Sequence, residues 1–446
     1  MSVKLRIHQV RCGSVTAGYN RFMSIRHLLS FLSVTGLATL AFSLPAAAQT
    51  VAPSTATLSL TQALQAAQNN LDVSLARRAL DAARGDVTAA DRAPTPTLSA
   101  KAASIDLQNG IGRGSVLGQK RIDKAIGLDW TLERGNKREL RTQAALSLAN
   151  AAQFDVDDIK IQQQITTAAA YFDLLAAQER TAEVEAIAKS AAQLATTAQR
   201  RVQAGDLPAL DAARTEIEAQ RATTDLASAQ LDRQRAALGL AQLTGISSAA
   251  ALKVQADWPA LQAVPVDTTF PSVEGRADVR AAQQRLDAAR AALDVAAAQK
   301  NRDITLGTSF DHYPGTSTRL LEFRAQVPLN GFLGSYNFQG EIARAQAQLN
   351  QAEDTLEKTR RLGAADFQRL QQDRRGAAAR ALSYDTTILP RARKVAEMAE
   401  LAYSKGAMSL TELIDARRTL RSILIEALSA RTDHAKAAQA WLIRQP

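Results

Sequence analysis

The chain has 446 residues, of which only 4% are aromatic, and Lys and Arg outnumber Asp and Glu by 54 to 44, for a formal net charge of +10. Few aromatic side chains and abundant alanine favour long, closely packed helices over a thick globular core. Because the basic residues are interspersed with acidic ones along the chain, the net charge does not indicate nucleic-acid binding.

The N-terminal segment has the pattern of a secretory signal peptide. The apolar run LLSFLSVTGLATLAFSLP is followed by Ala46–Ala48, a small-residue cleavage site. Residues 1–48 are therefore expected to be removed, with the true start at Met1 or at Met23. Removal takes five basic residues and no acidic one, which lowers the formal charge from +10 to +5, and it takes the one cysteine, Cys12. The mature protein is expected in the periplasm or beyond.

Two parts of the chain resemble each other. The stretch DVSLARRALDAAR (72–84) matches DVRAAQQRLDAAR (278–290) at an offset of 206, and at an offset of 201 the stretch around Gly205 aligns with the stretch around Gly406. We infer that one supersecondary unit is used twice. The first repeat is predicted at 49–256 and the second at 276–446, with a proline-spaced linker at 257–275 between them.

Each repeat is predicted to contain a helix, a β-hairpin, a long helix and a further helix. In chain order these elements are expected at 59–91, 97–134, 136–204 and 208–243, and then at 276–300, 303–329, 335–405 and 409–442. The long helices of about 70 residues would each extend on the order of 100 Å, a length typical of coiled coils. Pro390 should kink or interrupt the second of them.

The hairpins alternate between apolar and polar residues. One face of the second hairpin would carry Ile304, Leu306, Phe310, Leu321, Phe323 and Val327, with charged and polar residues on the other face. This pattern fits the wall of an outer-membrane barrel with these side chains toward lipid, and alternation alone fits a soluble two-faced sheet equally well. Four strands cannot close a barrel, since small barrels have about eight, so a membrane-spanning wall would require several chains.

With this order of elements, the chain resembles the TolC-like outer-membrane efflux family over nearly all of its mature length. LERGNKREL (132–140) and VPLNGFLGSYNFQGEIARAQAQL (327–349) resemble the segments that follow each hairpin in the heavy-metal and cation efflux branch. Residues 339–345 match that pattern closely, and Gly135–Arg138 departs slightly from it. The resemblance does not identify the cargo.

The resemblance implies a mainly α-helical protein with β-strands, in which three chains form a twelve-stranded β-barrel continued by a tunnel of twelve helices. It implies the outer membrane of a Gram-negative bacterium with extension into the periplasm, and contact with outer-membrane lipid. It also implies a passive exit duct that works with a periplasmic adaptor protein and an inner-membrane pump.

The resemblance also assigns roles near the two glycine turns. It implies that Gly205 and Gly406 turn the helix tips that contact the adaptor, and that Glu412 and Asp415 ring the periplasmic entrance. A hydrogen bond between Tyr403 and Asp211 would then help to hold the entrance closed. Where a well-known family member has arginine, this chain has Met408.

Each of these residues also has an ordinary interpretation. Ser409 and Glu412 form a capping-box pattern at a helix start, Tyr403 suits packing at a helix end, and Asp211 suits the first turn of a helix. Asp415 is not needed for the cap. Acids three residues apart, with no nucleophile or cleft nearby, do not indicate catalysis, and the mature chain lacks the ligands of a transition-metal site. Neither an enzymatic activity nor a cofactor is expected.

The alternative function is that of a periplasmic coiled-coil adaptor or scaffold protein. Such a protein would have similar helical hairpins, but it would normally carry a compact β-rich domain instead of two alternating hairpins between helices. Exposure of Phe310 and Phe323 to water would favour this alternative.

Overall fold

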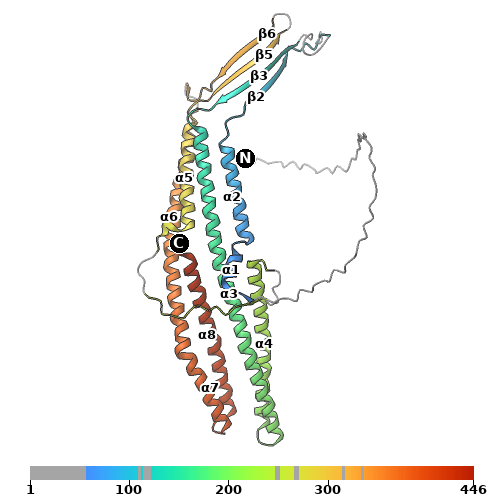
Figure 1. The fold of residues 1–446 in the computed structure, drawn as a ribbon, viewed down its shortest axis with the longest axis vertical. Helices are drawn as coiled ribbons and strands as arrows, with labels where there is room; N and C mark the ends of the chain where they lie inside the picture. The colour runs from blue at the N-terminus through green and yellow to red at the C-terminus, as the bar shows by residue number, and fades with distance from the viewer. Residues whose placement is uncertain are drawn as a thin grey trace, which may run out of the picture. The chain divides into compact units, whose positions relative to one another are not determined.

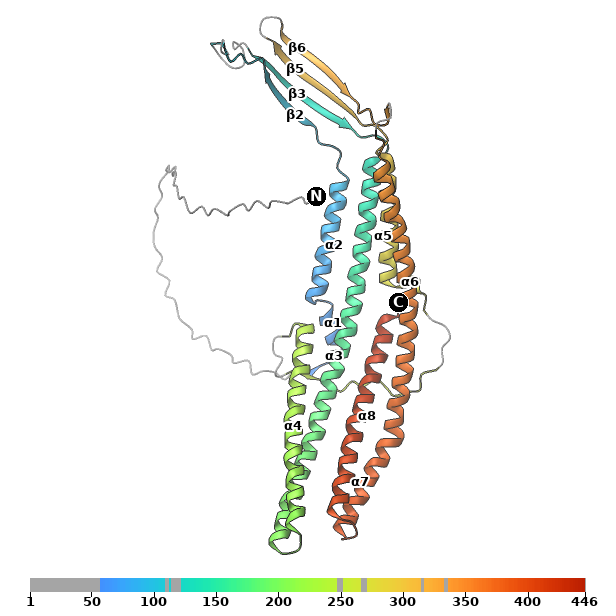
Figure 2. The ribbon, with the colours of Figure 1, turned by 180° about the vertical axis from the view of Figure 1, so that it is seen from behind.

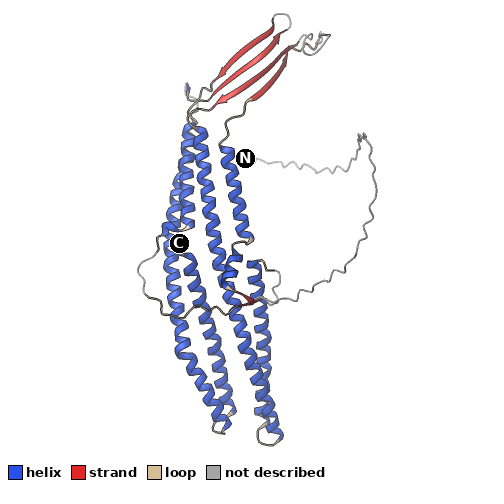
Figure 3. Ribbon diagram, in the orientation of Figure 1, coloured by secondary structure: helices blue, strands red, loops and turns tan. Residues whose placement is uncertain are grey.

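A computed structural model describes residues 57–108, 112–113, 122–246, 252–265, 271–313, 317–332 and 336–445, all within one compact unit, Pro53–Pro446. The expected signal peptide, residues 1–48, lies outside the described residues. In this unit the helices lie side by side, and a four-stranded sheet lies beyond one end of them (Figure 1). The unit is mainly helical with one substantial sheet (Figure 3), as the sequence predicts.

A helix, two strands, a long helical segment and a further helix follow in this order in each half, with additional short elements that differ between the halves. The first half contains β1 (Thr57–Leu58), α1 (Leu60–Ala67), α2 (Leu71–Ala90), β2 (Thr97–Ala103), β3 (Asp123–Leu132), α3 (Lys137–Gln203), α4 (Ala209–Thr244) and β4 (Lys253–Val254). The second half contains a 3-10 turn (Val273–Gly275), α5 (Ala277–Ala298), β5 (Ile304–Tyr313), β6 (Ser317–Gln326), α6 (Gln339–Ser383), a π-helical turn (Tyr384–Ile388), α7 (Leu389–Ser404) and α8 (Leu410–Arg444). The division into repeats at 257–275 stays a prediction.

Two expected helices are interrupted. The helix expected at 59–91 breaks after Ala67, because Asn70 caps a new helix by accepting a hydrogen bond from the backbone N–H of Asp72 at 3.2 Å. The helix expected at 335–405 is divided by the π-helical turn, directly before Pro390. Proline cannot donate the hydrogen bond that a continuous α-helix requires, which explains the interruption there.

The two hairpins form one antiparallel sheet in the order β2-β3-β5-β6. The halves of the chain meet at its centre, where Ile126 of β3 pairs with Phe310 of β5 and Trp130 pairs with Leu306. On β6, Leu321 pairs with Phe310 and therefore lies on the same face. We call this the apolar face. The opposite face carries an ion pair between Arg324 and Asp129, with 2.5 Å between nitrogen and oxygen.

The largest apolar cluster lies midway along the helices, where α1, α3, α4, β4 and α8 meet. Tyr171, Phe172 and Leu240 are fully buried there. Trp258, at the start of the linker, stacks on Phe172 with 5.8 Å between ring centroids, and the Tyr171 hydroxyl donates a 2.7 Å hydrogen bond to the carbonyl of Gln255. The start of the linker is thus held against the helices at this level. No helix in the described part of the chain is both long and apolar enough to span a bilayer.

Candidate functional site: the paired helix tips

The two glycine turns expected from the sequence have matching geometry. Gly205, between α3 and α4, has a φ of +82°, and Gly406, between α7 and α8, has a φ of +74°. The N–H of Gly205 donates to the carbonyl of Val202 and the N–H of Gly406 donates to that of Tyr403, each at 3.0 Å. Both are left-handed helix endings that favour glycine. The two tips lie at the end of the helices remote from the sheet (Figure 1).

Glu412 caps the start of α8. Its carboxylate accepts hydrogen bonds from the backbone N–H of Ser409 at 2.9 Å and from the Ser409 hydroxyl at 2.8 Å. The N–H of Glu412 donates back to that hydroxyl at 3.3 Å. These bonds from Ser409 hold the pKa of Glu412 below its ordinary value. The capping role of Glu412 is therefore real, and the residue remains exposed to solvent.

Asp415 is free of this cap and exposed, with 65% of its side chain accessible. Its nearest cation is Arg418 on the same helix, with 3.7 Å between nitrogen and oxygen. An ion pair of this length between exposed groups contributes little to the stability of the protein. The carboxylate is consequently available to attract cations from solution.

Tyr403 and Asp211 have partners other than each other. The Tyr403 hydroxyl accepts a hydrogen bond from Arg201 of α3 at 3.5 Å, and the Asp211 carboxylate accepts one from Arg214 at 3.3 Å. The hydrogen bond expected between Tyr403 and Asp211 is not among those of the described residues. Arg214 also donates to the Thr411 hydroxyl at 3.1 Å, which connects the first tip to the second.

Met408 and Tyr403 pack against a small apolar cluster at the second tip. Leu410, Leu413 and Ile414 form its centre with Ala399. Leu194 of α3 also contacts this cluster. Packing therefore joins the two tips at the level of Met408.

Further from the tips, ion pairs join α4 to α8. Glu218 pairs with Arg418, and Asp225 pairs with Arg421 at 2.8 Å. The hydrogen bond from Arg418 is the main reason that the pKa of Glu218 lies below its ordinary value. Sequence reasoning missed these pairs, although acids recur on α4 every seven residues, a spacing that places them along one side of a coiled-coil helix.

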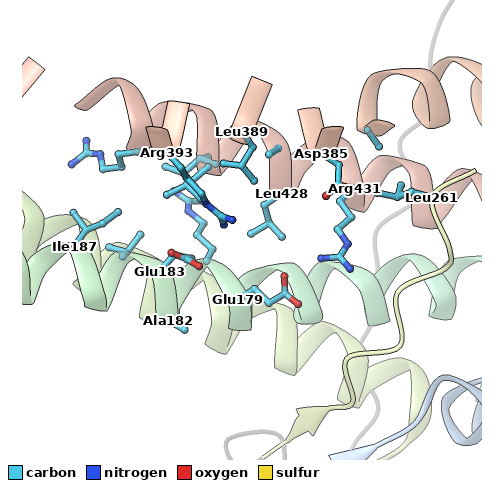
Figure 4. A pocket seen from close by; sticks show the side chains of 17 residues that line it. Glu179, Ala182, Glu183, Ile187, Leu261, Asp385, Leu389, Arg393, Leu428 and Arg431 are labelled. Carbon is cyan, nitrogen blue, oxygen red and sulfur yellow. The ribbon is translucent and has the colours of Figure 1, made fainter. Parts of the chain in front are cut away.

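We call α3 with α4 the first coiled coil and α7 with α8 the second. A cavity of about 280 Å³ lies between α3 and the second coiled coil (Figure 4). Val184 and Ile187 line it from α3, and Leu428 lines it from α8. Asp385, in the π-helical turn, and Arg393 of α7 also border it. The two coiled coils are therefore incompletely packed against each other here, and ion pairs hold them together nearer the tips.

The apolar face of the sheet is uncovered in a single chain, and its contact with lipid stays a prediction. Leu306, Phe310, Leu321, Phe323 and Val327 are between 42% and 77% exposed, and Ile304 is half-buried. Val327 lies one residue beyond the end of β6.

Among the described residues, no group of three or more His, Cys, Asp and Glu side chains is placed to hold a metal ion.

Comparison with known proteins finds a family match and similar relatives. Residues 39–246 match the family described as Outer membrane efflux protein. The cobalt-zinc-cadmium resistance protein CzcC of Cupriavidus metallidurans is 26% identical over 361 residues, covering 80% of this chain and 82% of that protein.

Solved structures share the fold. The outer membrane protein VceC of Vibrio cholerae has a TM-score of 0.70 at 18% identity, with 86% of this chain and 95% of that chain covered. The CmeC outer membrane channel of Campylobacter jejuni has a TM-score of 0.70 at 15% identity, with 86% and 85% covered. The resemblance expected from the sequence is confirmed by the match to the outer membrane efflux protein family over residues 39–246 and by the similarity to CzcC over most of both chains.

Proposed function

We propose that three copies of this chain form a passive exit duct, with a twelve-stranded barrel in the outer membrane and a twelve-helix tunnel in the periplasm. The duct would receive cargo from an inner-membrane pump through a periplasmic adaptor that contacts the tips at Gly205 and Gly406. The observation that carries the proposal is that one chain leaves both its sheet and its row of helices open at two edges.

The sheet has two unpaired edges, β2 and β6. Its apolar face is exposed along the central strands as well, where Trp130 is 55% and Phe310 is 54% exposed. Unpaired backbone N–H and C=O groups are not tolerated in the hydrocarbon of a bilayer. Strands from further copies would pair with these edges and leave the apolar face toward lipid.

The helices near the tips form an open row. α3 packs against α4 on one side and α8 on the other, and α8 packs against α7, so the outermost helices are α4 and α7 (Figures 1 and 2). Both present exposed apolar residues. These are Leu210, Ile217, Leu231 and Leu238 on α4, at multiples of seven residues, and Val395, Met398 and Leu401 on α7. A second copy would cover them if its α7 packs on this α4.

The positions of residues along the axes of α4 and α7 support such a contact. Glu218 of α4 pairs with Arg418, and Glu400 of α7 pairs with the adjacent Arg417 at 2.9 Å, so Glu218 and Glu400 lie at nearly the same height. Rotation about the axis of a ring leaves heights unchanged. Ile217, next to Glu218, would therefore face Leu401 of a neighbouring copy.

The cargo is proposed to be a metal cation or a small molecule. The cobalt-zinc-cadmium resistance protein supports metal cations, through its similarity over most of both chains. At the entrance, three copies would bring Glu412 and Asp415 together as six carboxylates, which would attract cations. Tyr403 and Asp211 would lie beside this entrance.

Disulfide cross-linking tests the assembly. In a Cys12→Ser background, the pair Ile217→Cys and Leu401→Cys should link neighbouring copies on oxidation, and heat-labile trimers should be recovered from the outer-membrane fraction. The matched control replaces Leu231 instead of Ile217, since Leu231 lies on the same stripe about 20 Å further along α4. A soluble periplasmic monomer, or equal cross-linking in the control, would contradict the proposal.

A further inference from the structure

Charged residues separate by face at the end of the sheet remote from the helices. Lys124 of β3 pairs with His312 of β5, in the row beyond the apolar pair Ile126 and Phe310. Successive side chains of a strand point to opposite faces, so both basic residues lie on the apolar face. The acidic residues next to them, Asp123 and Asp311, point to the other face.

The third strand continues this arrangement. Arg319 of β6 precedes Leu321 by two residues, and this spacing places it on the apolar face, beside an irregularity in the pairing of β5 and β6. Arg319 is exposed, and no hydrogen bond or ion pair joins its side chain to the described residues. We call Lys124, His312 and Arg319 the basic row.

The Lys124 ammonium group has no acceptor among the residues that the structure describes. Its nitrogen is shielded from water and makes no hydrogen bond within the described part of the chain. A charged group in this position is unfavourable unless an acceptor is supplied. The four-carbon stem of lysine allows the ammonium to extend along the sheet toward an acceptor at the edge of the apolar face.

The position of the basic row indicates the chemistry of that acceptor. The adjacent row of the apolar face holds Ile126, Phe310 and Leu321, which are between 54% and 65% exposed. If the apolar face meets hydrocarbon, the next row outward lies at the level of the lipid headgroups, where phosphate groups lie. Ammonium and guanidinium groups form strong, charge-assisted hydrogen bonds with phosphate.

We propose that the basic row binds the phosphate groups of anionic lipid headgroups at the outer end of the barrel. This inference rests on the proposed function, because it requires the apolar face to lie in the membrane. Because Asp123 and Asp311 point to the opposite face, they do not repel a phosphate group bound at the basic row. Three copies would present three such sites around the barrel.

Lipid binding by the assembled full-length protein in neutral detergent tests the inference. The probe is a fluorescent diphosphorylated glucosamine-disaccharide lipid, compared with the dephosphorylated lipid that carries the same acyl chains. We expect the wild-type protein to prefer the phosphorylated lipid, and the double variant Lys124→Gln with Arg319→Gln to bind it about tenfold to thirtyfold more weakly. Inorganic phosphate at the same concentration should not displace the lipid.

Lys101→Gln is the matched control. Lys101 is an exposed lysine of β2 that pairs with Ala125, at nearly the same level of the sheet but on the opposite face. Its replacement should leave lipid affinity unchanged. Equal wild-type affinity for both lipids, equal binding by the double variant, equal loss in the control, or displacement by inorganic phosphate alone would each overturn the inference.

The experiment separates this inference from the proposed function. If heat-labile trimers form in the outer membrane but lipid affinity does not depend on phosphate, only the basic row is wrong. If no membrane trimer forms, the proposed function fails first. Should the double variant fail to assemble, the wild-type comparison of the two lipids still decides, because it requires no substitution.

Discussion

The guanidinium of Arg276 donates two hydrogen bonds to the carboxylate of Asp278, at 3.0 and 2.8 Å, although Arg276 is only 6% exposed. Arg276 also pairs with Asp366 of α6 at 3.1 Å. Arg444, near the end of α8, pairs with Asp158 of α3 at 2.9 Å and approaches the same two carboxylates. One buried cluster of charges therefore joins α3, α5, α6 and α8.

Replacement of Arg276 by Met should destabilise the protein strongly. Methionine fills much of the space of the arginine stem, but it leaves Asp278 and Asp366 without their main partner. Breaking a buried ion pair in this way costs about 3–5 kcal/mol. The free energy of unfolding in urea, measured on the detergent-solubilised protein, should fall accordingly. Arg78→Met is the control, because the side chain of Arg78 is 84% exposed and pairs with Asp81, three residues away on the same helix. Equal stability of the two variants would contradict a stabilising role for the cluster.

The same cluster should make the protein sensitive to acid. Burial raises the pKa of Asp278, but hydrogen bonds and the charge of Arg276 outweigh it, so the net pKa lies below the ordinary 3.8. The pKa of Asp366 is also lowered. Burial raises it, and the hydrogen bonds from Arg369 and Arg276 outweigh that effect. A carboxylate with a lowered pKa in the fold stabilises it above the unfolded pKa, and this contribution is lost as pH falls through the folded pKa.

Stability should therefore decline below about pH 4, and unfolding midpoints measured from about pH 6 to pH 3 should show it. Arg276→Met should flatten the decline, because its carboxylates no longer have a charged partner that favours ionisation. An identical slope in wild type and variant would assign the acid sensitivity to other groups.

Asp415→Asn should weaken the preference of the duct for cations. Asp415 is exposed and only loosely paired, so in a trimer three such charges would act on ions at the entrance. Single-channel recordings should show a cation-to-anion permeability ratio lowered by about twofold or more, and weaker block by multivalent cations. Glu216→Gln is a suitable control, because it removes the same charge from an exposed position of α4 at a similar height. Equal effects of both variants would reduce Asp415 to one surface acid among others.

Local sequence signals predicted much of this site. Glycine at Gly205 and Gly406 and the pair Ser409 and Glu412 each act over a few residues, so their turn and cap follow from the sequence. The partners of Tyr403 could not be predicted in the same way. Arg201 reaches Tyr403 only because α3 and the second tip lie at a particular lateral offset, which depends on how the two coiled coils pack along their length.

The interruptions of the two helices were also predicted only in part. Pro390 predicted a disturbance of the second long helix, but not its form, which is a π-helical turn beside a cavity. The break between α1 and α2 was missed because the expected helix is continuous in its apolar pattern across Asn70. The side chain of Asn70 competes for backbone hydrogen bonds at this point, a local effect that periodicity does not reveal.

The ion pair between Glu218 and Arg418 should help to keep the entrance closed. It joins α4 to α8 beside a region where the coiled coils are incompletely packed, and the side chain of Glu218 is only 18% exposed. A partly exposed pair of this kind contributes about 0.5–1 kcal/mol, so its loss should shift the ratio of open to closed states by about twofold to fivefold. Glu218→Gln and Arg418→Gln should each raise the resting conductance of the reconstituted channel.

The double variant should behave like either single variant, because both substitutions remove the same contact. Arg221→Gln is the matched control, since Arg221 also approaches Glu218, at 3.4 Å, but from within α4 and without bridging the helices. An additive double variant, or an equal rise in conductance for Arg221→Gln, would show that the pair does not hold the two coiled coils together.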